Sequence, residues 1–182
     1  MTQTPLGQEL VTRVGANGDA VFSSCERYRY NLTRKWVHQS KTSRRFILWV
    51  LLNPSTADEN KLDPTLTRCA EFSRSWGYDG MIVRNVFAYR TPSPKVMLQA
   101  RNSGIDIIGP ANDLWLNDHA GVALTIVGWG ALPLARDRAE QVVKLLGPGL
   151  LCMGLNNGGS PKHPLYLSKQ TRPIPFSLVF GA

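Results

Sequence analysis

An apolar run of seven residues, Phe-Ile-Leu-Trp-Val-Leu-Leu, occupies positions 46 to 52. Because apolar and polar side chains do not alternate in it, the run predicts a strand buried on both faces, as in the middle of a parallel sheet covered by helices. Pro54 has no N–H and pushes Asn53 away from helical geometry, so the strand ends here. Small polar side chains then stand at its carboxyl end, where ligands bind in open α/β sheets.

Further apolar runs alternate with amphipathic segments along the rest of the chain. The runs predict strands and the amphipathic segments predict helices, two of which begin with a capping side chain, Asp63 or Ser93, before a proline. Strands that alternate with helices imply right-handed crossovers and a doubly wound sheet. The expected strands are 46–52, 81–87, 122–127 and 150–155, and the expected helices are 64–76, 94–100, 112–119 and 134–146.

The beginning of the chain has a different pattern. Residues 1–20 are rich in Gly, Thr and Asn without periodicity, which predicts a loose arm or an irregular strand. The next segment alternates in the period of a strand and carries the aromatic residues Tyr28, Tyr30 and Trp36 among basic ones. This strand resembles a platform that stacks bases and contacts phosphates. The same pattern also fits aromatic core residues beside a solvated basic edge.

Length and composition indicate one core. The chain has 182 residues, of which 43% are hydrophobic, and this is enough for a single α/β domain. We expect a three-layer sandwich with a mostly parallel four-stranded central sheet plus N-terminal edge strands, formed by residues 21–182 after the arm 1–20. The three cysteines lie far apart without Cys-x-x-Cys spacing, which indicates reduced thiols rather than a zinc site or disulfides. We expect no metal and no other cofactor.

The charge of the chain points to a polyanion. The formal net charge is +8, and basic proteins gain affinity for phosphates through counterion release. The sequence has no apolar stretch of about 18 residues that would cross a bilayer. Its first residues also lack the basic start and apolar centre of a secretion signal. We therefore expect a cytoplasmic monomer that binds no membrane and whose partner is nucleic acid, DNA rather than RNA.

Polar side chains far apart in the sequence should converge, because the carboxyl ends of parallel strands meet at one edge of a sheet. Asn53 could position a water molecule or a base edge, or it caps the turn before Ser55. Asn85 lies in an otherwise apolar strand, so its amide is either satisfied by the backbone or aimed at a ligand. His163, beside Lys162 in a loop stiffened by prolines, is placed to stabilise a developing anion. A surface histidine would have the same sequence context.

The loop after the first apolar strand holds further candidates. Ser55 and Thr56 could offer hydroxyl or N–H groups to a phosphate, but the chain has no Gly-rich cradle with a lysine, which argues against a nucleoside triphosphatase. Asp58 is the stronger candidate for a general base, because Asp63 is better explained as a helix cap. The chain also has no Gly-x-Ser-x-Gly motif and no Ser, His and Asp order typical of a hydrolase triad.

Several motifs occur together between Cys25 and Leu167. They are RYRYNLTRKW at 27–36, LNPSTAD at 52–58, DPT at 63–65, SWGY at 75–78, NVFAYR at 85–90 and KHPLYL at 162–167. In this combination they resemble an uncharacterised bacterial and phage family catalogued as domain of unknown function 1643. The resemblance covers most of the chain but implies no activity.

A more distant resemblance is to the uracil-DNA glycosylase superfamily, which has a doubly wound sheet of four parallel strands. Asn53-Pro54 is similar to its first motif, whose Asn helps to position the attacking water, and Asn85 is similar in placement to an Asn that reads the base. Trp129-Gly130 resembles a Trp-Gly that ends a strand there. His163-Pro164 matches the first half of the last motif, His-Pro-Ser-Pro, whose His stabilises the departing base. The chain departs from this pattern at Leu165-Tyr166 and lacks the usual Gly before Asn53.

Residues and resemblance together lead to one hypothesis and two alternatives. The leading hypothesis is a DNA glycosylase-like enzyme that hydrolyses the N-glycosidic bond of a damaged or modified base extruded into a pocket at the sheet edge. The alternatives are a non-catalytic nucleic-acid or nucleotide-binding module of the same fold and an enzyme of free nucleosides or nucleotides. The expected catalytic residues are Asn53, Asp58 and His163; the expected base-binding residues are Asn85, Ser55, Thr56, Tyr89 and Lys162; and the expected phosphate-binding residues are Arg29, Arg34 and Arg90.

Overall fold

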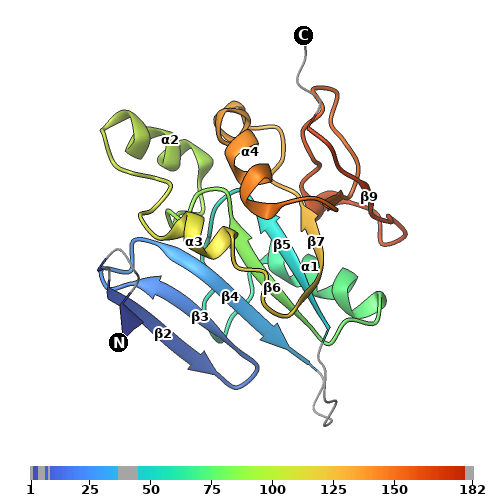
Figure 1. Cartoon of the computed structure of the whole chain (residues 1–182), viewed down its shortest axis with the longest axis horizontal. Coiled ribbons are helices and arrows are strands. Elements are labelled where there is room, and N and C mark those ends of the chain that lie inside the picture. The colour runs from blue at the N-terminus through green and yellow to red at the C-terminus, as the bar shows by residue number, and fades with distance from the viewer. Residues whose placement is uncertain (1, 4–6, 8, 37–44, 179–182) are drawn as a thin grey trace.

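The structure is a computed structural model that describes residues 2–3, 7, 9–36 and 45–178. In this part of the chain one sheet carries helices on both of its faces (Figure 1). Its strands are β1 Thr2–Gln3, β2 Glu9–Gly15, β3 Gly18–Ser23, β4 Arg29–Lys35, β5 Phe46–Leu51, β6 Gly80–Asn85, β7 Val122–Val127, β8 Leu151–Cys152 and β9 Ile174–Pro175. The strand order is β1-β2-β3-β4-β6-β5-β7-β8-β9.

The centre of the sheet is parallel, as the sequence predicts. Strands β6, β5, β7 and β8 are neighbours in this order, and each pairs with the next in parallel. The other pairings, among β1 to β4, between β4 and β6 and between β8 and β9, are antiparallel. The prediction of a mostly parallel sheet therefore holds for the centre alone. The whole sheet is mixed, because an antiparallel unit of four strands continues it beyond β6.

Four α-helices lie in the described part of the chain, and they cover both faces of the parallel strands. They are α1 Pro64–Ser75, α2 Pro94–Asn102, α3 Asn112–Leu116 and α4 Pro133–Leu146. Residues of α1 pack on one face, whereas residues of α2, α3 and α4 pack on the other (Figure 1). The expected helices are all present, although α3 is shorter than the predicted 112–119. Among the described helices none is long and apolar enough to cross a membrane.

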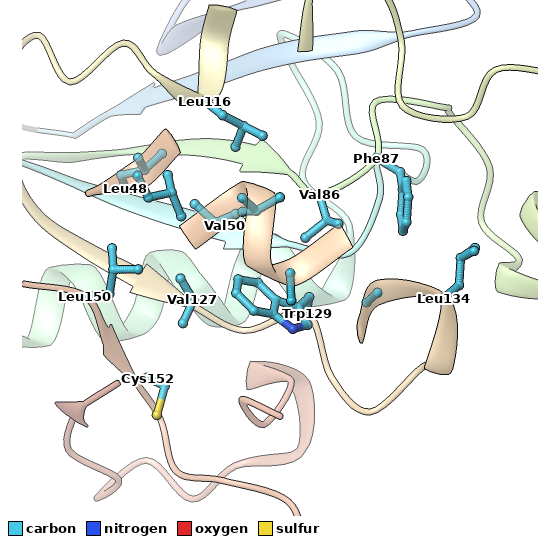
Figure 2. Close-up of a cluster of buried hydrophobic side chains, with 14 of the residues drawn as sticks. Leu48, Val50, Val86, Phe87, Leu116, Val127, Trp129, Leu134, Leu150 and Cys152 are labelled. Atoms are coloured by element: carbon cyan, nitrogen blue, oxygen red, sulfur yellow. The ribbon is translucent and has the colours of Figure 1, made fainter. Parts of the chain in front are cut away.

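The apolar run at 46–52 contains strand β5, which contacts a hydrophobic cluster on each of its two faces. Ile47 and Trp49 point into the cluster formed with α1, whereas Leu48 and Val50 point into the cluster on the opposite face. Figure 2 shows Leu48 and Val50 within that second cluster. Because helices cover both faces, every position of the strand after Phe46 is buried. Trp49 also donates its indole N–H to Ser73 Oγ at 2.9 Å, which fixes α1 on the sheet.

Most of the described residues of the segment 1–20 lie in strands, so of the two alternatives for this segment the strand holds and the loose arm does not. Strands β2 and β3 form an antiparallel hairpin in which Gly15 pairs with Gly18, so only two residues connect the strands. A Cβ atom on Gly18 would lie 1.9 Å from the carbonyl oxygen of Thr33, so only glycine fits this close approach to β4. The Asn17-Gly18 dipeptide is a hairpin signal. The alternation of apolar and polar residues in β2 is too weak to predict the strand from the sequence alone.

Two other strands differ from the expected pattern. Strand β4 lies between β3 and β6, so it is an interior strand and not a basic edge. Tyr28 and Tyr30 are buried in a hydrophobic cluster, as the core interpretation requires, but Arg29 and Arg34 are buried as well. Strand β8 is limited to Leu151–Cys152 instead of 150–155. These two residues pair with β7 on one side and with β9 on the other, and the chain leaves the sheet after Cys152.

Candidate functional site

A cavity of about 410 Å³ opens at the carboxyl ends of β5 and β6. Its wall comes from β4, the end of β5 and the loop after it, the first turn of α1, the end of β6 and the segment around the start of α2. His163, Leu165 and Tyr166 complete it. Asn53, Asn85 and His163 all line this space, which we call the Asn53 cavity, so the prediction that they converge is confirmed. The polar residues of its lining are Arg29, Asn53, Ser55, Asp63, Thr65, Asn85, Thr91, His163 and Tyr166.

Arg29 and Asn85 form the most buried polar part of this lining. Their residues are 2% and 1% exposed. Arg29 donates from Nη1 to the carbonyl of Ala57 at 2.9 Å and from Nη2 to Asn85 Oδ1 at 3.3 Å. Arg29 Nε and Asn85 Nδ2, in contrast, have no hydrogen-bond partner among the described residues. Since a buried donor without a partner costs about 1–3 kcal/mol, a ligand that accepts hydrogen bonds from these two atoms would stabilise this end of the cavity.

The guanidinium of Arg29 gives the buried end a positive charge. It forms no salt bridge with a carboxylate of the described residues. Burial lowers the pKa of Arg29 to about 10, and the negative charge of Asp63 opposes this shift. Arg29 is therefore still protonated at neutral pH. A group that accepts hydrogen bonds and carries partial or full negative charge would be stabilised here.

Asn53 joins two loops at the edge of the cavity. Its Nδ2 donates to the carbonyl of Thr91 at 2.8 Å and to the carbonyl of Pro54 at 3.1 Å. The amide nitrogen thus has a structural role, in line with the turn interpretation. Asn53 Oδ1 accepts no hydrogen bond from any described residue, so this oxygen can still orient a water molecule or a ligand donor.

His163 is a half-buried residue at the N-cap of a short 3₁₀ helix, Pro164–Tyr166. Its Nδ1 accepts from the backbone N–H of Leu165 at 3.4 Å, so in the neutral ring the proton is on Nε2. Burial lowers the pKa of His163, and the charge of Asp63 partly opposes this shift. The neutral imidazole is therefore favoured at pH 7. Its Nε2–H is then available as a donor.

The carboxylate of the cavity is Asp63 and not Asp58. Asp63 caps α1 by accepting from the N–H of Leu66 at 2.9 Å, as predicted, and it also lines the cavity. Asp58 lies outside the lining and accepts from the N–H groups of Asn60 and Lys61. These bonds lower the pKa of Asp58 and make it a weaker base. The structure gives no support to Asp58 as the general base.

The other candidates for base contacts divide between the cavity and its surroundings. Ser55 lines the cavity, whereas Thr56, Tyr89 and Lys162 do not. Thr56 is exposed. Tyr89 forms an edge contact with the ring of Tyr28, 6.4 Å between centroids. Tyr89 is thus part of the packing, and Lys162 lies on the surface next to the cavity.

Two of the three arginines predicted to bind phosphate lie outside the cavity and contact only groups of the protein. Arg34 is 5% exposed and donates to the backbone carbonyls of Thr33, Asp58 and Lys61. Arg90 donates to the carbonyl of Glu26 at 3.0 Å and stacks over Phe22. Neither residue lines the Asn53 cavity. Arg29 is the exception, since its buried guanidinium reaches the cavity.

Sequence reasoning missed Tyr166 as a residue of the site. Tyr166 lines the cavity and yet is 90% exposed, so its ring is available to stack on a base. In the sequence, Tyr166 is notable only because it departs from the His-Pro-Ser-Pro motif. Its place three residues after His163, in a turn with two prolines, could have indicated that its ring lies near the site. Among the described residues there is no group of three or more His, Cys, Asp and Glu side chains that could hold a metal ion.

Comparison with known proteins identifies a family for this chain. A family model described as "Protein of unknown function (DUF1643)" matches residues 29–165. No curated protein and no solved structure matches the chain. The matched segment includes every residue of the polar lining except Tyr166.

Proposed function

This chain belongs to the DUF1643 family of proteins of unknown function, and we propose that it hydrolyses the N-glycosidic bond of a damaged or modified base in DNA. The observation that carries the proposal is the set of side chains around the Asn53 cavity. Asn53, Asp63 and His163 meet there with the buried pair Arg29 and Asn85. A cavity of about 410 Å³ falls in the usual range for small-ligand sites.

The proposed reaction assigns the side chains to two sides of one bond. A water molecule held by Asn53 Oδ1 attacks the sugar carbon, and the electron pair of the broken bond moves to the base nitrogen. Asp63 takes the proton of the water and stabilises the positive charge that develops on the sugar. His163 donates from Nε2–H to the departing base, which finally takes up a proton from solvent. Preorganised donors at a developing anion often supply the greater part of an enzyme's rate enhancement.

Two further observations support a nucleic-acid substrate. The net charge of +8 favours binding to phosphates. The order of Asn53-Pro54, Asn85, Trp129-Gly130 and His163-Pro164 along the chain resembles that in the uracil-DNA glycosylase superfamily. This likeness rests on motif order alone, since no solved structure matches the chain.

The test is release of free base from oligonucleotides that contain uracil, hypoxanthine or a mismatched thymine, read by cleavage at the resulting abasic site. We expect Asn53→Ala and His163→Ala to slow base release by about a hundredfold or more. Asn117→Ala and His119→Ala are matched controls, because both residues are exposed and lie outside the cavity. No base release from any of these substrates by the wild-type chain would contradict the proposal.

A non-catalytic binding module is the second candidate, and the hydrogen bonds of the site favour it. Asn53 Nδ2 and His163 Nδ1 both have backbone partners, as residues that only shape a pocket would. A module would bind base-containing oligonucleotides but leave them intact. An enzyme of free nucleosides, the third possibility, would instead cleave nucleosides faster than oligonucleotides under the same conditions.

A further inference from the structure

The buried end of the Asn53 cavity offers donors and no free acceptor. Asn85 Oδ1, which would otherwise accept a hydrogen bond from a ligand, is occupied by Arg29 Nη2 at 3.3 Å. Arg29 Nε and Asn85 Nδ2, which have no partner in the described part of the chain, are both donors. Their residues are almost completely buried. A ligand edge that satisfies this end must therefore present hydrogen-bond acceptors.

We infer that Arg29 and Asn85 select a base with two neighbouring acceptors, as O6 and N7 of a 6-oxopurine are. This inference rests on the proposed function for the nature of the ligand. An arginine that binds O6 and N7 is the commonest specific contact in protein–DNA complexes. Here the same two acceptors would meet Arg29 and Asn85 inside a cavity, which the base would enter after extrusion from its stack.

On the edge that corresponds to O6 and N7, adenine, cytosine and thymine leave this end unsatisfied, whereas guanine, itself a 6-oxopurine, satisfies it. Adenine presents a donor at N6 beside N7, and this amino group would face the donors of Arg29 and Asn85. Cytosine presents a donor at N4, and thymine presents one acceptor, O4, beside a methyl group. Hypoxanthine, in which an oxygen replaces the amino group of adenine, changes the mismatched donor into an acceptor. The subsite thus discriminates hypoxanthine from adenine, its parent base.

The first test uses free bases and the complete wild-type chain. We expect calorimetry to show that hypoxanthine binds at least about tenfold more tightly than adenine. 7-Deazahypoxanthine, which lacks the N7 acceptor, should bind more weakly than hypoxanthine by a similar factor. Equal affinity for hypoxanthine and adenine would overturn the inference. So would tighter binding of inorganic phosphate than of hypoxanthine, because phosphate oxygens also satisfy two donors without a base.

The second test changes the protein. Asn85→Asp replaces the Nδ2 donor by an acceptor of the same shape, so the preference for hypoxanthine over adenine should fall by about tenfold or more. Asn117→Asp makes the same change at an exposed position outside the cavity and should keep the preference. An unchanged preference in a folded Asn85→Asp protein would overturn the inference. If this variant does not fold, the comparison of the three free bases still decides the question.

Failure of the inference differs from failure of the proposed function. Binding that prefers hypoxanthine, without base release from any oligonucleotide, would keep the subsite and reject the hydrolase. Release of uracil but not of hypoxanthine would keep the hydrolase and overturn the subsite.

Discussion

At the residue scale, the buried environment of His163 has a measurable effect on its protonation. Burial lowers the pKa of His163 below its ordinary value of 6.5, with Asp63 opposing in part. The folded protein then binds fewer protons at this position than the unfolded chain. The contribution of His163 to the free energy of unfolding is therefore fully present above about pH 6.5, and it is lost as the pH falls below this value. We expect the wild type to lose more stability than His163→Gln between about pH 7 and pH 5, measured by urea denaturation.

The control for this prediction is the exposed His119. His119→Gln should follow the wild type over the same pH range. Direct titration of the His163 imidazole by NMR gives a second measurement, and Asp63→Asn should lower its pKa further because it removes the opposing charge. Titration of His163 at or above pH 6.5 in the wild type would contradict the described environment.

The residues of the site were predictable to different degrees. Asn53, Asn85 and His163 could be predicted as site residues because each lies at or after the carboxyl end of a strand. The parallel direction of these strands was itself predictable. The position of Arg29 could not, since its burial depends on β4 pairing with β6 across a long stretch of sequence. The choice between Asp58 and Asp63 also required the structure. Asp63 both caps a helix and lines the cavity, and its local sequence shows only the first of these roles.

At the element scale, Asp63 connects the stability of α1 with the chemistry of the cavity. Its side chain caps the helix at Leu66 N–H, 2.9 Å away. Asp63→Ala should reduce the free energy of unfolding by about 1 kcal/mol, because the capping bond is lost. Asp63→Asn keeps an oxygen that can cap the helix, so its stability should stay near that of the wild type in urea denaturation.

The same pair of variants separates the two roles of Asp63. If its carboxylate takes a proton in base hydrolysis, Asp63→Asn should lose activity although it keeps stability. Ser93→Ala serves as a control for the loss of a cap, since Ser93 caps α2 through Val96 N–H and does not line the cavity. Full activity of Asp63→Asn would exclude the carboxylate from the reaction.

Elements buried on both faces were predicted best. The strands near 46–52, 81–87 and 122–127 were found within two residues of their bounds, because continuous apolar runs require cover on both faces. The hairpin of β2 and β3 was missed, because it gains its order by pairing with β4 and not from its own apolar pattern. Strand β8 was overestimated, since its apolar continuation, Met153, packs against the core outside regular pairing.

At the scale of the whole molecule, the net charge of +8 can contribute to binding of DNA only through basic side chains that are exposed and can contact phosphates. Arg34, Arg84 and Arg138 are buried and donate to groups of the protein, so they are not placed to neutralise phosphates. Exposed lysines next to the cavity are placed for this role. Lys162 precedes His163, and Lys95 follows Pro94 of the cavity lining; both are exposed.

The last prediction concerns these two lysines. If DNA lies over the Asn53 cavity, the logarithm of its affinity should fall linearly with the logarithm of salt concentration, and Lys95→Ala or Lys162→Ala should each reduce this slope by about 1. Lys144→Ala is the control, because Lys144 is near the end of α4 that points away from the carboxyl edge of the sheet and pairs with Glu140 at 2.7 Å. Fluorescence anisotropy with a labelled oligonucleotide measures the slopes. Equal slopes for all three variants and the wild type would place the DNA elsewhere, and absence of binding at low salt would exclude nucleic acid as the partner.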